Sequence, residues 1–432
     1  MAGKLNIFQK TMIQWNALHP YNAIHVVRIR GQFDQARLTR AINSQLECWG
    51  LTRIAIDERK GSFHYHGGPA NSEIKVVQGE KDPHVALRDE IEKQLNTPFM
   101  GKATIDPFRF FVVQEQDAFY LGLVYCHLIS GAECIIFLLK HVVTRYMDRD
   151  EPSLDPPLNL YPESYCRLFK INPKSLLMWL CTLPSFISDL RKSCRPPNTN
   201  FEDHRVAFSF FSVDPERLQS LIRTGKLWGV TLNDIFLALL LTAISPLAQD
   251  RVHEARRKMI SIASIVNIRR DLGLDIQNTF GLFLGSFIVT HAVPEGIHIE
   301  NLAEDIHRQT LRIKRSQLYM RTTLGLALAR LLTPLFSPLA QNKFYPKYYP
   351  LWGGITNVNI NTFWKHGDQG VPADYFRAVS TGPVAPLVFS ITTVNDVLNI
   401  GVSFKPSVFS REDVDRIIAA FSNSLDTLRD RP

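Results

Sequence analysis

The histidine in the segment YCHLISGAEC, residues 125–134, is the residue best placed to do chemistry. His127 follows an apolar run with the composition of a strand and precedes a turn of small residues. An imidazole at such a position could act as a general base, because its unperturbed pKa lies close to neutral pH. The alternative is a histidine buried in the core beside a turn. The local pattern alone leaves both interpretations open.

Other potentially reactive groups in the sequence favour structural roles. Cys126 precedes His127, but adjacent strand residues face opposite sides, so we expect a buried thiol rather than an activated nucleophile. Ser130 lacks the Gly-x-Ser-x-Gly pattern of a nucleophile elbow. His64 and His66 share one strand face, but no third ligand with suitable spacing stands nearby. We therefore predict no metal site.

Strands and amphipathic helices must position these residues, and they occur in a similar order in both halves of the chain. Hairpins replace strict strand–helix–strand alternation, which favours two α+β sandwich domains of similar plan. The first half predicts a strand at 22–31, a helix at 34–50 capped by Asp34, short strands at 51–58 and 61–68, a helix at 82–99, a hairpin at 107–130 and a helix at 133–148. The second half predicts strands at 204–213, 259–268 and 281–293, helices at 214–229, 231–248 and 299–318, a hairpin at 386–406 and a closing helix at 410–428.

The domain boundaries follow from two proline-rich stretches, 148–164 and 191–204. They bracket a connection between an N-terminal domain at 1–170, which carries His127, and a C-terminal domain at 205–432. Residues 171–204 form the connecting segment.

Composition narrows the class of protein. With 45% apolar and 21% charged residues, the chain is globular, and its net charge of +8 is spread along the sequence without a nucleic-acid motif. The six cysteines are scattered and the N-terminus lacks a signal-peptide core, so we expect free thiols and a cytoplasmic location. No apolar run reaches the roughly 20 uninterrupted residues of a membrane span.

Two apolar segments, 175–190 and 324–340, are interrupted by prolines and charges. We interpret them as buried helices or as the lining of a tunnel for a greasy acyl chain or acceptor. Peripheral membrane contact is the less favoured alternative. The large side chains that suit such a lining are Trp179, Phe186, Leu335 and Phe336.

The order of these segments resembles the thioester-dependent acyltransferase superfamily of chloramphenicol acetyltransferase, condensation domains and wax ester synthases. The similarity covers nearly the whole chain. It implies two chloramphenicol-acetyltransferase-like lobes that form a V-shaped pseudo-dimer with a tunnel at their interface. The similar stretches are an opening strand and helix at 22–46, the start of the second half at 213–244, an arginine-then-glycine stretch at 265–289, a crossover region at 353–361 and a closing hairpin at 389–417.

The family motif is His-His-x-x-x-Asp-Gly, and CHLISGA falls on it. The resemblance implies that His127 is the general base that takes a proton from an alcohol or amine as it attacks a thioester carbonyl. The donor would be acyl-CoA or a phosphopantetheinyl thioester on an acyl carrier protein. No cofactor would be bound permanently, and the acceptor could be lipophilic. The developing oxyanion needs a hydrogen-bond donor, and the candidates are Ser390, Thr392 and Thr393, with Asn357 behind them.

The motif is degenerate in this chain. Cys126 replaces the first histidine and Gly131 replaces the aspartate that, in the family, pairs with an arginine and holds the loop. Arg269 occupies the arginine position, so we expect Glu133 or Asp271 to replace the missing carboxylate. Two hypotheses follow: an acyltransferase with an altered support for its base, or an inactive relative that acts as a docking or recruitment partner in a biosynthetic pathway.

Overall fold

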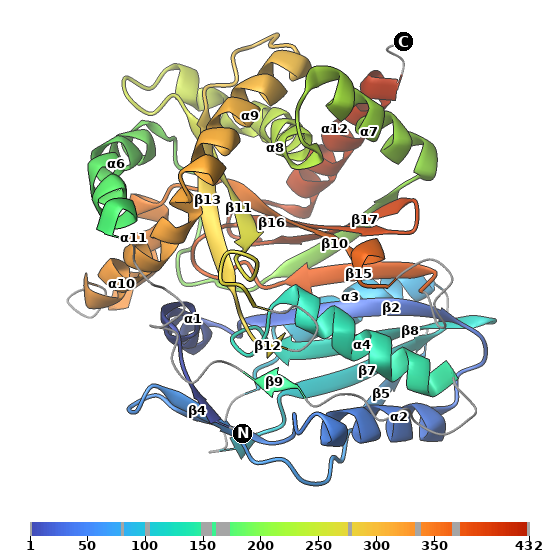
Figure 1. Ribbon diagram of the computed structural model, residues 1–432. Coiled ribbons are helices and arrows are strands. Elements are labelled where there is room, and N and C mark those ends of the chain that lie inside the picture. The colour runs from blue at the N-terminus through green and yellow to red at the C-terminus, as the bar shows by residue number, and fades with distance from the viewer. Residues whose placement is uncertain are drawn as a thin grey trace.

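The protein is represented by a computed structural model that describes residues 2–78, 82–99, 104–147, 158–160, 173–274, 279–332, 338–364 and 372–429. Figure 1 shows two main β-sheets, one in each lobe, with helices packed against them. The chain begins in the lower lobe of that view and ends in the upper one. This is the two-lobed α+β arrangement that the sequence predicts.

The sheet of the lower lobe carries the histidine at the end of one of its inner strands. Val27 packs into the large core cluster that includes α2 and α4, whereas Ile24 and Val26 pack with α3. The strand order is β15-β2-β8-β7-β5, with only β5 and β7 parallel. The elements are β2 (Asn22–Arg30), α2 (Gln35–Cys48), β5 (Ile74–Val77), α3 (Pro83–Leu95), β7 (Phe108–Gln114), β8 (Ala118–Cys126), α4 (Ala132–Met147) and β15 (Asp374–Val379).

The sheet of the upper lobe has six strands in the order β10-β17-β16-β14-β11-β13. Figure 1 shows the outer helices above it. The strands are β10 (Ala207–Val213), β11 (Ile260–Asn267), β13 (Leu284–His291), β14 (Gly353–Asn359), β16 (Leu387–Val394) and β17 (Val397–Phe404). The helices are α7 (Pro215–Trp228), α8 (Leu232–Ile244), α9 (Ile299–Arg315) and α12 (Arg411–Arg429).

Strand β15 links the lobes, because it comes late in the chain and pairs with β2 of the lower sheet. It passes close to β17 at Gly401, where a Cβ would overlap the carbonyl oxygen of Arg377. The expectation that residues 353–361 make the crossover is wrong: most of them form β14, which lies between β11 and β16. The glycines there serve close packing, since a Cβ on Gly354 would lie 3.1 Å from the carbonyl oxygen of Ala263.

The predicted helix starts hold because each first turn leaves N–H groups that a side chain can accept. Asp34, Asp82 and Asp214 accept from Arg37, His84 and Arg217 respectively, and Thr231 forms a capping box with Asp234. The last sheet hairpin turns at Asn395, which adopts a positive φ of 51°.

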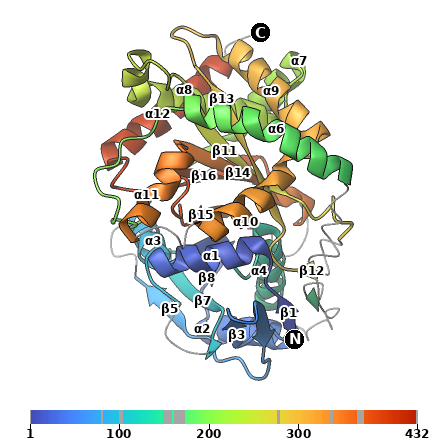
Figure 2. The ribbon, with the colours of Figure 1, turned by 90° about the vertical axis from the view of Figure 1, so that its left-hand side faces the viewer.

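Several further elements surround the space between the lobes, and the sequence predicts only part of them. Figure 2 shows α1, α6, α10 and α11 together on one side of the molecule. The first of these is unpredicted; it starts from a capping box of Asn6 and Gln9. These elements are α1 (Ile7–Leu18), α6 (Pro173–Lys192), α10 (Thr322–Leu332) and α11 (Pro338–Tyr348); two small sheets contain β1 (Ala2–Lys4), β3 (Ile54–Asp57), β4 (Ser62–Tyr65) and β6 (Thr104–Ile105), and β9 (Asn159–Leu160) and β12 (Thr279–Phe280).

One helical stretch, Leu232–Val252, is long and apolar enough to cross a membrane by length and composition, contrary to the expectation from the sequence. However, 61% of it is buried inside the protein, where α8 packs against α9 and α12. A core helix passes the same criteria, and that is the role of this stretch.

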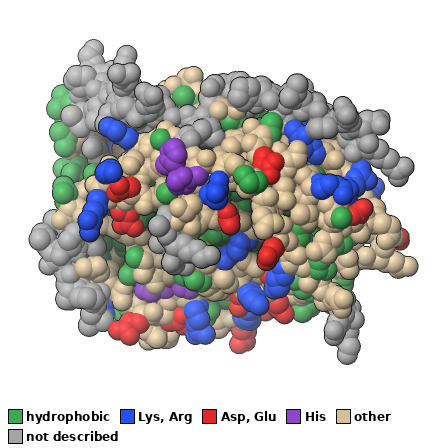
Figure 3. Space-filling model, turned by 90° about the horizontal axis from the view of Figure 1, so that it is seen from below, with side chains coloured by type: hydrophobic (Ala, Val, Ile, Leu, Met, Phe, Trp, Pro, Cys, Tyr) green, Lys and Arg blue, Asp and Glu red, His purple; other side chains and the backbone are tan. Residues whose placement is uncertain are grey.

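Charge is mixed over the lower lobe. Figure 3 views the molecule from below and shows Lys and Arg side chains interspersed with Asp and Glu over the described part of this face.

Most of the proline-rich stretch 148–164 lies outside the described residues, so the predicted domain boundaries there stay a prediction.

Candidate active site

His127 is held at the end of β8 by contacts on both sides. Its backbone N–H donates to the carbonyl oxygen of Tyr21 at 2.9 Å, which extends the pairing of β8 with β2 by one residue. The Tyr21 ring stacks on the imidazole with centroids 5.6 Å apart, and the Tyr125 ring meets it edge-on at 5.9 Å. The ring is therefore fixed in position by the strand and by two aromatic neighbours.

The hydrogen bond of the imidazole defines which nitrogen can act. Nδ1 lies 3.2 Å from the carbonyl oxygen of Ser130. A carbonyl only accepts, so Nδ1 carries the hydrogen and the lone pair is on Nε2. Burial lowers the pKa of His127 to about 4, and the positive charge of Arg377 acts in the same direction. The imidazole is therefore neutral at pH 7, as a general base must be.

The loop after His127 is tied down by backbone groups. The N–H of Gly131 donates to the carbonyl oxygen of Gly281 at 3.0 Å, and the Gln9 side chain donates to that of Leu128 at 3.0 Å. A Cβ on Gly131 would meet only the Gly281 carbonyl oxygen, at an ordinary 3.6 Å. Glycine is thus not required here by space.

Arg269 lies behind this loop and is almost completely buried, at 2% exposure. Its Nη1 donates to the carbonyl oxygen of Thr279, and its Nη2 donates to that of Gly281 and to Cys134 Sγ, at 2.9, 2.9 and 2.6 Å. The Glu133 carboxylate stands 3.8 Å from Nε. Of the two expected partners, Glu133 is the carboxylate that lies beside the guanidinium, and its role as the replacement charge stays a prediction.

Asp271, the other expected partner, is engaged elsewhere. It accepts a hydrogen bond from the Tyr319 hydroxyl at 2.8 Å. Burial raises the pKa of Glu133 even though Arg269 acts to lower it. The arginine is therefore satisfied mainly by carbonyls and a sulfur, with one carboxylate nearby.

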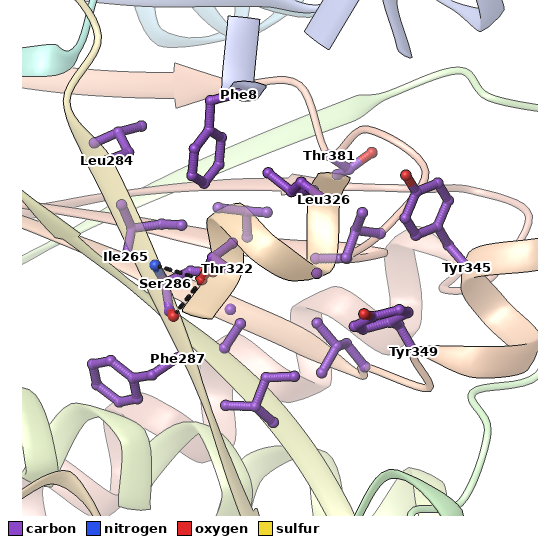
Figure 4. Close-up of a pocket in the computed structure, with 18 of the residues that line it drawn as sticks. Phe8, Ile265, Leu284, Ser286, Phe287, Thr322, Leu326, Tyr345, Tyr349 and Thr381 are labelled. Carbon is purple, nitrogen blue, oxygen red and sulfur yellow. Dashed lines mark hydrogen bonds between the residues drawn. The ribbon is translucent and has the colours of Figure 1, made fainter. Parts of the chain in front are cut away.

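The imidazole faces a cavity of about 860 Å³ between the lobes. Most of the wall is apolar, as Figure 4 shows for Phe8, Leu284, Phe287 and Leu326. Phe186 and its neighbours on α6 line one side, so the predicted lining role of that segment is confirmed for them. The Trp179 side chain, Leu335 and Phe336 lie outside the described residues.

The polar part of the wall comes from the upper sheet and β15. Ser390 is 1% exposed, lines the cavity, and its hydroxyl has no hydrogen-bond partner among the described residues. Thr356 is paired with it in register on β14. Thr392 lies outside the lining and accepts from Arg377 Nε at 2.8 Å.

Two further predicted oxyanion candidates, besides Thr392, do not reach the cavity. Asn357 is exposed and does not line it, because strand residues alternate between faces and its neighbour Thr356 takes the inner one. Thr393 is also absent from the lining, because it lies on the face of β16 opposite to that of Ser390 and Thr392. Ser390 is left as the predicted hydroxyl that faces the cavity.

The remaining predicted residues have structural positions. Cys126 is buried in the core away from the cavity, and burial raises the pKa of its thiol to about 12. Ser130 is buried, and its hydroxyl donates to the Gly131 carbonyl oxygen at 3.1 Å. His64 and His66 have rings 4.9 Å apart, and the described residues contain no cluster of three potential metal ligands.

Three residues that shape the site were not predicted from the sequence. Tyr21 precedes the opening strand, Gln9 lies on the unpredicted α1, and Arg377 lies on β15, the strand that links the lobes. Of the three unpredicted residues, only Tyr21 had a signal in the sequence, because it is an aromatic residue directly before the opening strand.

A second cavity histidine, His25, is less suited to act as a base. Its Nδ1 lies 2.7 Å from the Tyr375 hydroxyl and its Nε2 lies 3.5 Å from that of Tyr125.

Comparison with known proteins identifies similar sequences and folds. A family model described as a condensation domain matches residues 5–432. A search of curated proteins found no match. The EpoB cyclization-docking bidomain of a nonribosomal peptide synthetase from Sorangium cellulosum has a TM-score of 0.72 at 14% identity, over 100% of this chain and 85% of that one.

Two further solved structures are similar over 100% of this chain and 98% of their own. The condensation domain of the monacolin K polyketide synthase MokA has a TM-score of 0.71 at 12% identity. The first condensation domain of the calcium-dependent antibiotic synthetase, solved with a substrate analogue, has a TM-score of 0.71 at 15% identity. At these identities the solved structures show a shared fold.

Proposed function

Because the chain belongs to the condensation-domain family, we propose that it transfers an acyl group from a phosphopantetheinyl thioester to an amine or hydroxyl, with His127 as general base. Members of this family form amide or ester bonds between substrates bound to carrier proteins. The observation that carries the proposal is the placement of His127: Nδ1 contacts the Ser130 carbonyl oxygen, which leaves the lone pair on Nε2, and the residue lines the cavity.

The proposed reaction follows from that orientation. Nε2 takes the proton from the acceptor nitrogen or oxygen as this atom attacks the thioester carbonyl carbon. The carbon–sulfur bond then breaks, and the imidazolium returns the proton to the departing thiolate. The products are an amide or ester and a free thiol. The lowered pKa of His127 makes its imidazolium a good acid for the second step. It also makes the neutral imidazole a weaker base for the first step, which therefore depends on stabilisation of the oxyanion.

Ser390 is the proposed donor to that oxyanion. Its hydroxyl is buried, lines the same cavity and has no partner among the described residues, so its hydrogen is available to a ligand. The apolar wall around it favours a lipophilic acyl chain or acceptor. Both acyl-CoA and an acyl carrier protein present the same phosphopantetheinyl arm, and either is proposed as donor.

The test is product formation by mass spectrometry. Purified protein is mixed with short and long acyl thioesters, on CoA and on a carrier protein, and with a panel of amines and alcohols. His127→Gln should reduce transfer by about 10²–10⁴-fold without changing the thermal unfolding midpoint. His64→Gln is the matched control, because His64 is exposed and lies outside the cavity.

The competing function is docking without catalysis, and the replacement of the motif aspartate by Gly131 favours it. It predicts that the thioesters stay intact with both the wild type and the variant. Transfer that is equal in wild type and His127→Gln would contradict the assigned base but not the transfer itself.

A further inference from the structure

A second buried arginine lies in the cavity wall, and the proposed chemistry does not use it. Arg377 is on β15, is 4% exposed and lines the cavity. Its neighbours are mostly neutral oxygens of the upper sheet: Nε donates to Thr392 Oγ1 at 2.8 Å, and Nη2 donates to the carbonyl oxygens of Ile391 and Thr356 at 2.6 and 3.0 Å. These bonds fix the direction of the guanidinium.

The guanidinium has a donor to spare. Nη1 carries two hydrogens, and its one contact among the described residues is Thr356 Oγ1 at 3.5 Å, the outer limit of a hydrogen bond. Thr356 also lines the cavity, so a ligand oxygen between the two could accept from both. The rest of the guanidinium is already satisfied, which leaves this one edge for a ligand.

The positive charge is also uncompensated. Within the described part of the chain, Arg377 makes no ion pair with a carboxylate within 4.0 Å; Glu133 acts on it only from a distance and lies against Arg269 instead. Burial lowers the pKa of Arg377 to about 10, which reflects the cost of keeping this charge away from water. A buried charge is normally paired, so an anionic ligand is the missing partner.

We propose that Arg377, with Thr356, binds a carboxylate carried by a substrate whose remaining body is apolar. That this ligand is a substrate rests on the proposed function, whereas its binding does not require turnover. The neighbouring wall supplies the rest of the specificity: Phe8, Leu284 and Leu326 offer an apolar surface within the same cavity, as Figure 4 shows. A charge-assisted, two-donor site in such a cavity should discriminate strongly between a carboxylate and a neutral group.

The experiment compares decanoate with decanamide, which have the same length and differ in charge. Isothermal titration at pH 7 should show decanoate binding to the wild type about 10–100-fold more tightly. Arg377→Met should reduce that ratio to about one, because methionine keeps the apolar stem and removes every donor. Thr356→Val should reduce the ratio by about 3-fold, and it keeps the test usable if Arg377→Met does not fold.

Arg195→Gln is the control, because Arg195 lines the exposed part of the same cavity and could attract an anion non-specifically. It should leave the preference for decanoate unchanged. The proposal is overturned if the wild type binds the two probes equally, binds neither, keeps its preference in both Arg377→Met and Thr356→Val, or loses it in Arg195→Gln. A preserved preference in a protein that transfers no acyl group would contradict the proposed function and leave this site in place.

Discussion

The region behind the His127 loop and the wall of the cavity each contain a buried arginine, and the surroundings of the two arginines differ. Arg269 is enclosed by two carbonyls, the Cys134 sulfur, the Phe283 ring and the Glu133 carboxylate. Arg377 has carbonyls and a hydroxyl on one side and the cavity on the other. A fully enclosed charge holds a loop, whereas a charge with an open edge is available to a ligand.

The difference also explains how the loop tolerates the loss of its motif aspartate. The N–H of Gly131 and the Nη2 of Arg269 share one acceptor, the carbonyl oxygen of Gly281. The loop is thus connected to the arginine through the backbone of Gly281, next to β12, rather than through a side chain of its own. Four consequences test this comparison.

The largest expected effect comes from removing Arg269. Arg269→Met removes the guanidinium hydrogens donated to the carbonyls of Thr279 and Gly281 and the positive charge beside the Glu133 carboxylate, which should lower the free energy of unfolding by about 3–5 kcal/mol. Arg377→Met should cost about 2 kcal/mol or less, because it also removes an uncompensated buried charge. Urea unfolding of both variants measures the difference, and equal losses would break the comparison.

The second test concerns the acid limb of the rate. A general base must be neutral, so the proposed transfer should be lost as the pH falls through the pKa of His127, which burial and Arg377 hold at about 4. The rate should therefore stay constant from pH 7 down to about 5, where an unperturbed histidine of pKa about 6.5 would already be mostly protonated. Single-turnover rates against pH measure this, and a limb near 6.5 would place the base in water.

Arg377→Met sharpens the same measurement, because it removes a positive charge that disfavours the imidazolium. The acid limb should move to higher pH in this variant. Arg269 is not among the causes of the shift of the His127 pKa, so a conservative change such as Arg269→Lys should leave the limb in place if the protein folds. An unchanged limb in Arg377→Met would show that burial alone sets the pKa.

The sequence predicts most of the fold because the relevant signals are local. The caps Asp34, Asp82 and Asp214 and the apolar runs of β7 and β8 are encoded in adjacent residues. The crossing strand was missed because β15 is defined by its partner, β2, which lies more than three hundred residues away.

The candidate site divides along the same line. His127 was accessible from a motif and Ser390 from a hydroxyl-rich stretch, whereas Asn357, expected behind those hydroxyls, does not line the cavity. The role of Arg377 was not predictable from the sequence. It depends on the lack of a carboxylate close to the guanidinium among the described residues, and only three-dimensional packing reveals which charges lack a partner. Tyr21 stacks on His127 because β2 pairs with β8, and an aromatic residue before a strand does not by itself predict that contact.

Glu133 gives a smaller effect with an unusual sign. Burial raises the pKa of Glu133 above its ordinary value, so the folded state takes up a proton more readily than the unfolded state does. The carboxylate therefore contributes stability that increases as the pH falls toward its unfolded pKa. Glu133→Gln should change the unfolding free energy at pH 7 by about 1 kcal/mol or less, and it should remove this part of the pH dependence.

The measurement is the difference between the unfolding free energies of wild type and Glu133→Gln at pH 7 and at pH 5. Taking the difference cancels the other titrating groups. A loss of about 3 kcal/mol or more at pH 7 would mean that Glu133 and Arg269 act as a tightly coupled ion pair after all.

The smallest effect is expected at Gly131, which stands at the aspartate position of the motif that this segment resembles. The backbone there is not in the left-handed region, and an added Cβ would have ordinary contacts, so Gly131→Ala should raise the unfolding free energy by about 0.4–1 kcal/mol by restricting the unfolded chain. Acyl transfer should stay within about 2-fold of the wild type, because no contact of His127 changes. A loss of stability or of activity would show instead that the loop needs the freedom of glycine, and that its support is not independent of this side chain.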